Sequence, residues 1–158
     1  MWRKKYRGDV IFSCRDAEGV IDVVDETAAV RSLQFGTEAR QSTMFRHDPN
    51  TLALSYTQCM VTSLLFADAD PRQALVFGLG GGSMVKYLLA QCPACRVDAV
   101  ERRAAVIDVA HRFFQLPEAH PRLAVYSEDA TSFLSTAADA EAAPAQPDEA
   151  PAPQAFGW

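Results

Sequence analysis

Four of the chain's eight glycines lie in one short run, Gly78-Leu-Gly80-Gly81-Gly82. Such a run lets the backbone approach a ligand with no Cβ in between, and the free N–H groups at the start of a following helix attract a carboxylate or a phosphate. The run directly follows an apolar segment, residues 74–77, and directly precedes an amphipathic one, residues 83–90. This position predicts a ligand-binding loop in which Gly78, Gly80 and Gly82 face the ligand, although glycine clusters also occur in tight turns without one.

Two carboxylates follow later apolar segments in the same way. Glu101 comes directly after residues 97–100, about twenty positions beyond the glycine loop, as in folds that bind dinucleotides and nucleosides. A carboxylate there can accept hydrogen bonds from both ribose hydroxyls. Asp129 follows a third apolar segment, residues 123–126, and we expect it at the same edge of the sheet, where ligands bind in open α/β sheets. Together they predict a nucleoside site, although the pattern separates it only weakly from an NAD site.

Alternating short apolar segments and helical periodicities predict the elements that position these residues. Strands at 74–77, 97–100 and 123–126 alternate with helices at 83–90, at 104–114 and from residue 131, which is the pattern of a parallel α/β sheet. Upstream, strands at 10–14, 20–24 and 29–35 form a small β-meander, followed by a helix from Ser55 to about Phe66. We therefore expect a Rossmann-like domain over residues 51–136, preceded by a β-strand domain over residues 1–50.

The composition changes abruptly at Ala137. From there to residue 158 the chain is rich in alanine, holds four of its nine prolines and has no basic residue. This segment is predicted to be a linker or disordered tail without a regular helix. It ends in the apolar Phe156-Gly157-Trp158, as if a strand were about to begin, and we therefore expect the chain to be a fragment of a longer protein.

Several motifs together resemble the spermidine synthase family, the polyamine aminopropyltransferases, over roughly residues 10–135. They are Arg31-Ser-Leu-Gln-Phe35, Gln41-Ser42, Tyr56, Leu75-Val-Phe-Gly-Leu-Gly-Gly-Gly82, Val100-Glu101, Val106-Ile-Asp-Val-Ala110, Phe113-Phe114 and Asp129-Ala-Thr-Ser-Phe-Leu134. The resemblance implies the fold of class I S-adenosylmethionine-dependent methyltransferases. It also implies that the chain binds decarboxylated S-adenosylmethionine or S-adenosylmethionine, or the product methylthioadenosine, without a metal.

The same resemblance implies a role for individual residues. Glu101 would hold the ribose, Asp129 would lie near the adenine, and Gln41 would face the nucleoside from the N-terminal side. Tyr56 would border the channel of the acceptor amine. The implied activity is transfer of an aminopropyl group to a polyamine, as a transferase of polyamine biosynthesis.

The chain departs from the family pattern at the amine half of the site. It has Tyr56-Thr57-Gln58 where the family usually has Tyr-His-Glu, and Gly81 where the glycine loop usually carries an aspartate. The family's catalytic aspartate follows a fourth strand, which we do not expect within these residues. The catalytic residue is therefore unassigned, with Tyr56 and Asp129 as candidates. A methyltransferase and a non-catalytic nucleoside-binding module remain as alternatives.

Composition excludes several other classes of function. With 15 basic and 20 acidic residues the net charge is −5, and no basic block follows a phosphate backbone, which argues against nucleic acid as a partner. Charges interrupt every apolar segment well short of about 20 residues, so we expect a cytoplasmic protein rather than one in a membrane. Cys92 and Cys95 are interpreted as buried or loop thiols, with a redox dithiol as the alternative. The expected partners are a nucleoside and a polyamine, and a homodimer is left open.

Overall fold

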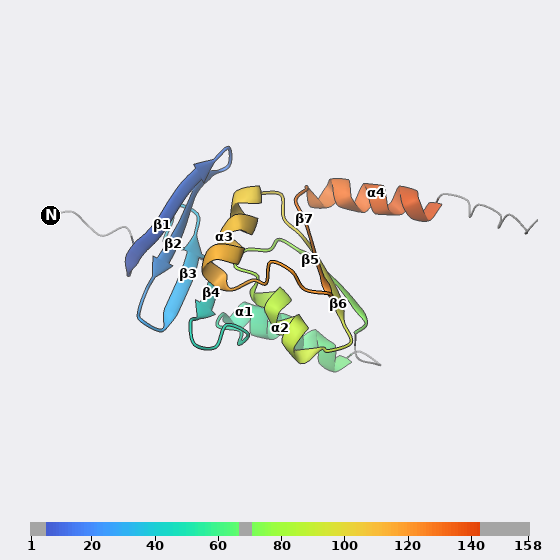
Figure 1. Ribbon diagram of the computed structural model, residues 1–158, viewed down its shortest axis with the longest axis horizontal. Coiled ribbons are helices and arrows are strands. Elements are labelled where there is room, and N and C mark those ends of the chain that lie inside the picture. The colour runs from blue at the N-terminus through green and yellow to red at the C-terminus, as the bar shows by residue number, and fades with distance from the viewer. Residues whose placement is uncertain (1–5, 67–70, 143–158) are drawn as a thin grey trace, which may run out of the picture.

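The computed structural model describes residues 6–66 and 71–142, which form two sheets with helices between them (Figure 1). The N-terminal sheet is antiparallel with the strand order β1-β2-β3-β4, and the second sheet is parallel with the order β5-β6-β7. Helices α2 (Ser83–Gln91) and α3 (Ala104–Phe114) lie between the two sheets in Figure 1, and each contacts a strand of the N-terminal sheet. The expected α/β fold with a small N-terminal β-sheet is confirmed.

The N-terminal sheet is a four-stranded meander of β1 (Asp9–Asp16), β2 (Gly19–Asp25), β3 (Val30–Gln34) and β4 (Arg40–Phe45). The fourth strand was not expected from the sequence. Its first residues, Arg40-Gln-Ser-Thr43, are polar and lack the apolar alternation that marks a strand. It forms because it pairs along β3, and its residues Ser42, Thr43 and Met44 are buried.

The parallel sheet consists of β5 (Gln73–Phe77), β6 (Arg96–Val100) and β7 (Leu123–Tyr126). Its register aligns Phe77 with Val100 and Val100 with Tyr126, so the three strands end at one level. Two hydrogen bonds extend the sheet past these ends: Gly78 N–H donates to the Val100 carbonyl, and Glu101 N–H donates to the Tyr126 carbonyl, both at 2.9 Å. The glycine loop and Glu101 therefore begin side by side.

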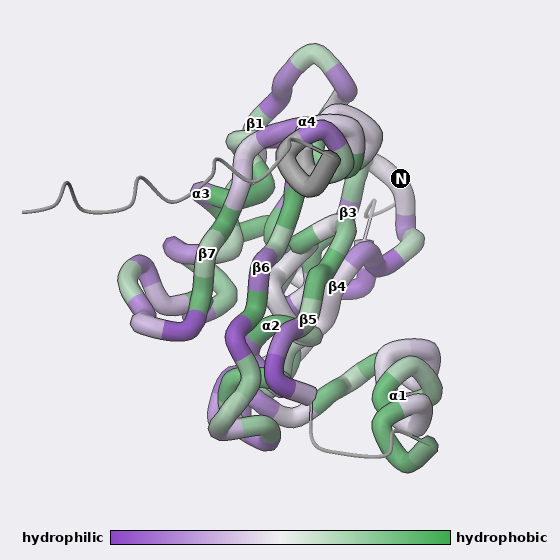
Figure 2. Tube along the Cα trace, turned by 90° about the vertical axis from the view of Figure 1, so that its right-hand side faces the viewer, coloured by the Kyte–Doolittle hydropathy of each residue, from purple (hydrophilic) through white to green (hydrophobic). Residues whose placement is uncertain are grey.

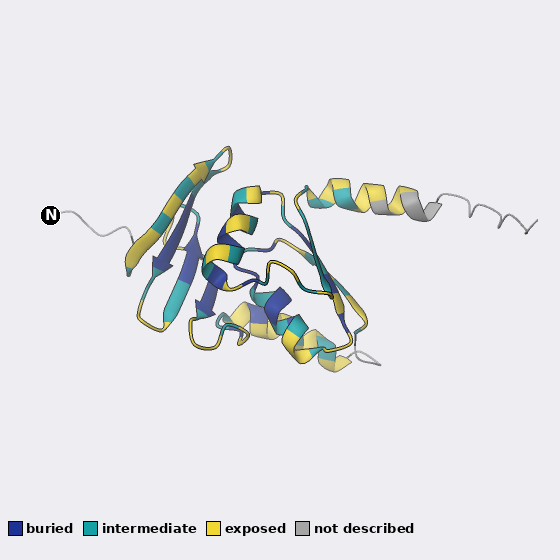
Figure 3. Ribbon diagram, viewed as in Figure 1, coloured by how far each residue is buried: buried dark blue, intermediate teal, exposed yellow. Residues whose placement is uncertain are grey.

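Two apolar clusters join these layers. In one, Val85 and Leu88 of α2 pack with Val97 and Ala99 of β6. In the other, one face of α3 packs on β2, β3 and β4 through Val106, Val109, Phe114, Ile21, Val23, Leu33 and Met44. Figure 3 shows β2 and β3 as largely buried and, where burial is described, α4 (Ala130–Ala142) as largely exposed. The residues that follow β5 and β6 are thus held between two packed layers.

Helix α4 differs from the sequence expectation at its C-terminal end. A tail without regular helix was expected from Ala137, but the helix continues to Ala142. Alanine and glutamate are strong helix formers, and the first proline of this segment comes only at Pro144. The remainder of the predicted tail, with Phe156 and Trp158, lies outside the described residues.

The segment before β5 forms α1 (Ser55–Val61) and a 3₁₀ turn, η1 (Thr62–Phe66), where one helix was expected. Figure 2 shows hydrophobic residues along this segment, and several of them are exposed, including Tyr56, Met60, Leu65 and Phe66. No helix in residues 6–66 or 71–142 is long and apolar enough to cross a bilayer.

Candidate functional site

The glycine loop turns the chain from the end of β5 into α2. Gly78, Gly80 and Gly82 have φ angles of +80°, +54° and +69°, in the left-handed region that side chains with a Cβ rarely adopt. Gly82 is the N-cap residue of α2, and a Cβ there would lie 2.8 Å from Leu116 Cδ1. A Cβ on Gly78, by contrast, would meet nothing within 4 Å, so this glycine borders open space.

Glu101 is fixed against this loop by two backbone donors. Leu79 N–H donates to its Oε2 and Arg103 N–H donates to its Oε1, each at 3.0 Å. Since a carboxylate oxygen can accept two hydrogen bonds, each oxygen keeps one free lone pair. The carboxylate is thus oriented before any ligand arrives and can still accept two hydroxyl donors.

Next to Glu101 the structure has a hollow of about 270 Å³. Five of the residues predicted for the site line it: Gln41, Tyr56, Gly78, Gly80 and Glu101. They come from β4, α1, the glycine loop and the end of β6, segments that are far apart in the sequence. The rest of the lining is provided by Phe35, Ser42, Thr57, Met60, Val76, Phe77, Leu79, Ser83 and Met84.

Two of the predicted site residues lie elsewhere. Gly82 is the N-cap of α2 and packs on Leu116 rather than lining the hollow. Asp129 is exposed and directly precedes α4, where its Oδ1 accepts a hydrogen bond from Thr131 N–H at 2.8 Å. Backbone hydrogen bonds from Thr131 and Ser132 hold the pKa of this carboxyl below its usual value. The geometry of Asp129 is that of a helix N-cap.

Sequence reasoning did not assign Phe35, Met60 or Met84 to the site, although they line the hollow. A signal for Met60 was available, because Tyr56 and Met60 are four residues apart and share one face of α1. Methionine and phenylalanine provide polarizable contacts suited to aromatic rings and thioethers. These three side chains give the hollow an apolar part beside the Glu101 carboxylate.

The structure gives a physical reason for the departure at Gly81. A Cβ added there would lie 2.8 Å from Phe114 Cδ1 and 2.8 Å from Ser42 Oγ. Ser42 Oγ in turn shares a hydrogen bond of 3.1 Å with Ser83 Oγ at the start of α2. The space that an aspartate side chain would need at this position is already occupied.

The two residues of α1 that differ from the family pattern, Thr57 and Gln58, form hydrogen bonds within their own segment. Thr57 Oγ1 donates to the Leu54 carbonyl at 2.7 Å, and Gln58 Nε2 donates to the Leu52 carbonyl at 2.8 Å. Both side chains bond to the backbone segment that leads into the helix. Thr57 and Gln58 are neutral, and Glu101 is the only acidic residue among the described residues that line the hollow.

Lys86, in the helix that follows the glycine loop, is a buried cation that sequence reasoning missed. Its side chain is 3% exposed, and its Nζ donates to the Phe114 carbonyl at 2.5 Å and to Met44 Sδ at 3.3 Å. Burial lowers the pKa of this amine to about 8. A lysine in an amphipathic helix ordinarily faces water, so its type alone carries no signal of burial. Lys86 connects α2 to the C-terminal end of α3 and to β4.

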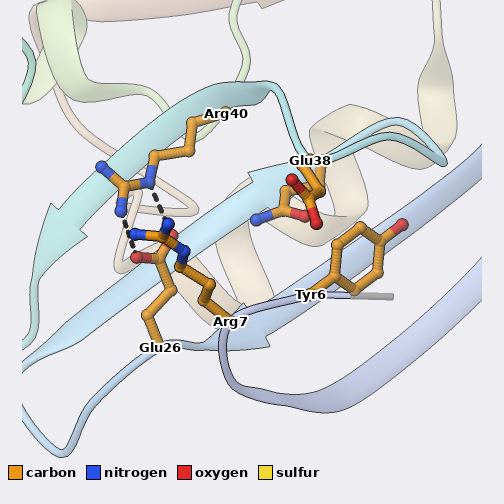
Figure 4. A pocket seen from close by; sticks show the side chains of 6 residues that line it. Tyr6, Arg7, Glu26, Glu38 and Arg40 are labelled. Atoms are coloured by element: carbon orange, nitrogen blue, oxygen red, sulfur yellow. Dashed lines mark hydrogen bonds and ion pairs between the residues drawn. The ribbon is translucent and has the colours of Figure 1, made fainter. Parts of the chain in front are cut away.

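A second hollow, of about 400 Å³, lies on the N-terminal sheet (Figure 4). Its charged residues are Arg7, Glu26, Glu38 and Arg40, and Arg40 forms a two-pronged ion pair with Glu26 in which Nε lies 2.7 Å from Oε1. No glycine loop or strand end of the parallel sheet borders it. We therefore place the candidate site at the smaller hollow beside Glu101.

Cys92 and Cys95 follow α2 in the loop that leads to β6, and both thiols are free. Cys95 is buried, and desolvation raises the pKa of its thiol. Among the described residues, no three or more histidine, cysteine, aspartate or glutamate side chains are grouped so that they could hold a metal ion.

No protein-family model matches the chain. Among curated proteins it is similar to the polyamine aminopropyltransferases of Chromobacterium violaceum, at 38% identity over 111 residues, and of Neisseria meningitidis, at 33% over 111 residues. Each match covers 70% of this chain but 42% of the relative. The chain thus spans less than half the length of the curated relatives that it matches.

Solved structures agree in fold. A probable spermidine synthase from Corynebacterium glutamicum has a TM-score of 0.65 at 19% identity, covering 79% of this chain and 47% of that one. A spermidine synthase in complex with the transition-state analogue AdoDATO has a TM-score of 0.62 at 17% identity, over 80% and 43%. Human methyltransferase-like protein 13 in complex with SAH has 0.54 at 25%, over 58% and 43%. The chain is therefore, as its motifs predicted, a relative of the polyamine aminopropyltransferases, with the methyltransferase-like fold of spermidine synthases over the part of them that it spans.

Proposed function

We propose that the hollow between the glycine loop, Gln41 and Tyr56 binds the nucleoside part of an S-adenosylmethionine-type ligand. The observation that carries the proposal is the Glu101 carboxylate, which two backbone N–H groups fix beside the open face of Gly78. A vicinal diol matches such a carboxylate because each hydroxyl donates to one oxygen. The apolar side chains of Phe35, Met60 and Met84 supply surface for the base and the thioether.

The ligand preference we expect follows from the charge of the lining. Glu101 is the acidic residue of the hollow, and no arginine or lysine is among the described residues that line it. A ligand with a carboxylate of its own would find no cation to pair with it there, so the decarboxylated form is favoured. This supports aminopropyl transfer over methyl transfer as the chemistry of the whole protein.

In the proposed transfer, an amine attacks the carbon next to the sulfonium, the carbon–sulfur bond breaks, and methylthioadenosine leaves with the electron pair. The amine must first lose a proton, because an ammonium has no lone pair and a simple alkylamine has a pKa of about 10. Tyr56 lines the hollow, and its phenol is the candidate group that could receive this proton. Asp129 is a weaker candidate because its carboxylate caps α4.

Calorimetry with three ligands tests the proposal. We expect methylthioadenosine and decarboxylated S-adenosylmethionine to bind, and S-adenosylmethionine to bind more weakly. Absence of binding by all three would remove the nucleoside site. Tighter binding of S-adenosylmethionine would favour a methyltransferase, the rival that the likeness to human methyltransferase-like protein 13 supports.

A further inference from the structure

Arg103 connects the two sheets through a buried guanidinium group. Arg103 is 8% exposed. Its Nε and one terminal nitrogen donate to the two carboxylate oxygens of Asp16, at 2.9 and 2.8 Å. The same terminal nitrogen also donates to the Gly19 carbonyl at 3.3 Å. Asp16 and Gly19 are the two residues that flank the turn between β1 and β2. The tip of this hairpin is thus attached to the residue that precedes α3.

The same side chain supports a wall of the candidate site. The guanidinium carbon lies 4.5 Å from the ring centroid of Phe35, within the range of a cation–π contact, and Phe35 lines the hollow. The backbone N–H of Arg103 donates to Glu101 Oε1. One residue therefore contacts both the apolar wall and the carboxylate of the hollow, although neither Arg103 nor Asp16 is among the described residues that line it.

Arg103 occupies a helix position that ordinarily favours a different kind of side chain. It is the N-cap residue of α3, where a short side chain with an oxygen acceptor is preferred, and no side-chain cap is present. Helix α3 therefore lacks the stabilisation of a side-chain N-cap, and the Arg103 side chain binds Asp16 instead. The two hydrogen bonds from Arg103 also hold the pKa of the Asp16 carboxyl below its usual value.

We propose that Arg103 is a positioning residue that fixes Glu101 and Phe35 by anchoring both to the β1–β2 hairpin through Asp16. A lysine cannot replace it, since an ammonium has no planar fork for two parallel hydrogen bonds and stacks poorly on a ring. The orientation of Glu101 then depends on a carboxylate in the other sheet. The consequence for nucleoside affinity rests on the proposed function, whereas the consequence for the Glu101 hydrogen bonds does not.

The experiment compares Arg103→Lys and Asp16→Asn with the unaltered protein and with a matched control. The control is the neighbouring pair Arg102 and Glu18, which joins the same loop and hairpin but is exposed, in the variants Arg102→Lys and Glu18→Gln. Hydrogen exchange of the Leu79 and Arg103 amides is measured without ligand, because both donate to Glu101. The affinity for methylthioadenosine and the melting temperature are measured for every variant.

We expect faster exchange at the Leu79 amide by roughly tenfold in Arg103→Lys and Asp16→Asn, and no change in the two control variants. The affinity should fall by about threefold to tenfold in each of the first two, and by no more in the double variant, because both changes break one connection. Unchanged amide exchange and affinity, with only a lower melting temperature, would overturn the proposal and leave Arg103 a structural residue. If exchange changes but the unaltered protein binds no nucleoside, the positioning role stands and the proposed function fails.

Discussion

In the hollow of the N-terminal sheet, Arg40 and Glu26 pair with each other, whereas in the hollow at the glycine loop two backbone N–H groups hold the Glu101 carboxylate. Arg40 and Glu26 satisfy one another's charge, and Arg40 is half-exposed to water, so the pair presents little unpaired charge to a ligand. Glu101 keeps acceptor capacity on both oxygens, and its orientation comes from main-chain geometry. The larger hollow is therefore the poorer candidate, because two of its four charged residues already pair with each other.

The largest effect is expected at Gly81, where packing excludes a side chain. Gly81→Asp should lower the free energy of unfolding by about 3 kcal/mol, since its Cβ would overlap Phe114 Cδ1 and Ser42 Oγ. Gly78→Ala is the matched control and should cost about 1 kcal/mol, because only its positive φ is strained. Urea unfolding measures both. Equal costs would mean that Phe114 moves aside easily.

The dependence of stability on pH should differ between the region around Lys86 in α2 and the N-terminal sheet. The pKa of Lys86 is lowered by burial to about 8, so the folded protein binds fewer protons than the unfolded chain between about pH 8 and the ordinary lysine value of 10.5. Stability therefore rises with pH across this window, by up to about 3 kcal/mol relative to Lys86→Met.

The contribution of the N-terminal sheet to stability should instead change at acidic pH. Hydrogen bonds from Arg31 hold the pKa of Asp25 below its ordinary value of 3.8, so its contribution to stability is present above that value and is lost as the pH falls through the lower, folded value. Denaturant midpoints from pH 7 to 10.5 test Lys86, and midpoints from pH 5 to 2 test Asp25. A flat alkaline limb in the unaltered protein would show that Lys86 is solvated.

The two carboxylates of the two hollows should differ in ligand binding. Glu101→Ala should weaken methylthioadenosine binding by roughly 1–3 kcal/mol, the cost of leaving hydroxyl donors without a charged acceptor. Glu26→Ala should leave the affinity unchanged, because Glu26 does not line the hollow beside Glu101. It should lower stability by about 1 kcal/mol, since it removes one ion pair whose partner, Arg40, is 45% exposed and can be hydrated instead. Calorimetry on both variants makes the comparison, and a similar loss of affinity in both would remove the distinction between the hollows.

The smallest effect is expected at Asp129. Asp129→Ala should lower stability by about 1 kcal/mol, since it removes the side-chain bond to Thr131 N–H at the start of α4. Its effect on nucleoside affinity should be smaller than that of Glu101→Ala, because Asp129 does not line the hollow. An affinity loss as large as that of Glu101→Ala would restore the adenine role that the family resemblance implies.

Local patterns in the sequence were sufficient to predict the elements of the parallel sheet and the contact between the glycine loop and Glu101. The three strands, the helices α2 and α3, and the level at which the strands end all follow from hydrophobic periodicity and from the parallel connection of β5, β6 and β7. The spacing of Glu101 from the loop then places the two side by side. These features depend on residues that are near one another in the sequence.

Tertiary structure decided what surrounds that contact. The polar strand β4 forms only against β3, Phe114 closes the space at Gly81, and Lys86 is buried under α3. The pairing of Arg103 with Asp16 joins residues 87 positions apart. None of these features has a local signal in the sequence, because a serine, lysine or arginine at a given position reads the same whether its side chain faces water or packs on another element. Their roles arise when the antiparallel sheet packs against α2 and α3, since burial and charge pairing depend on that packing.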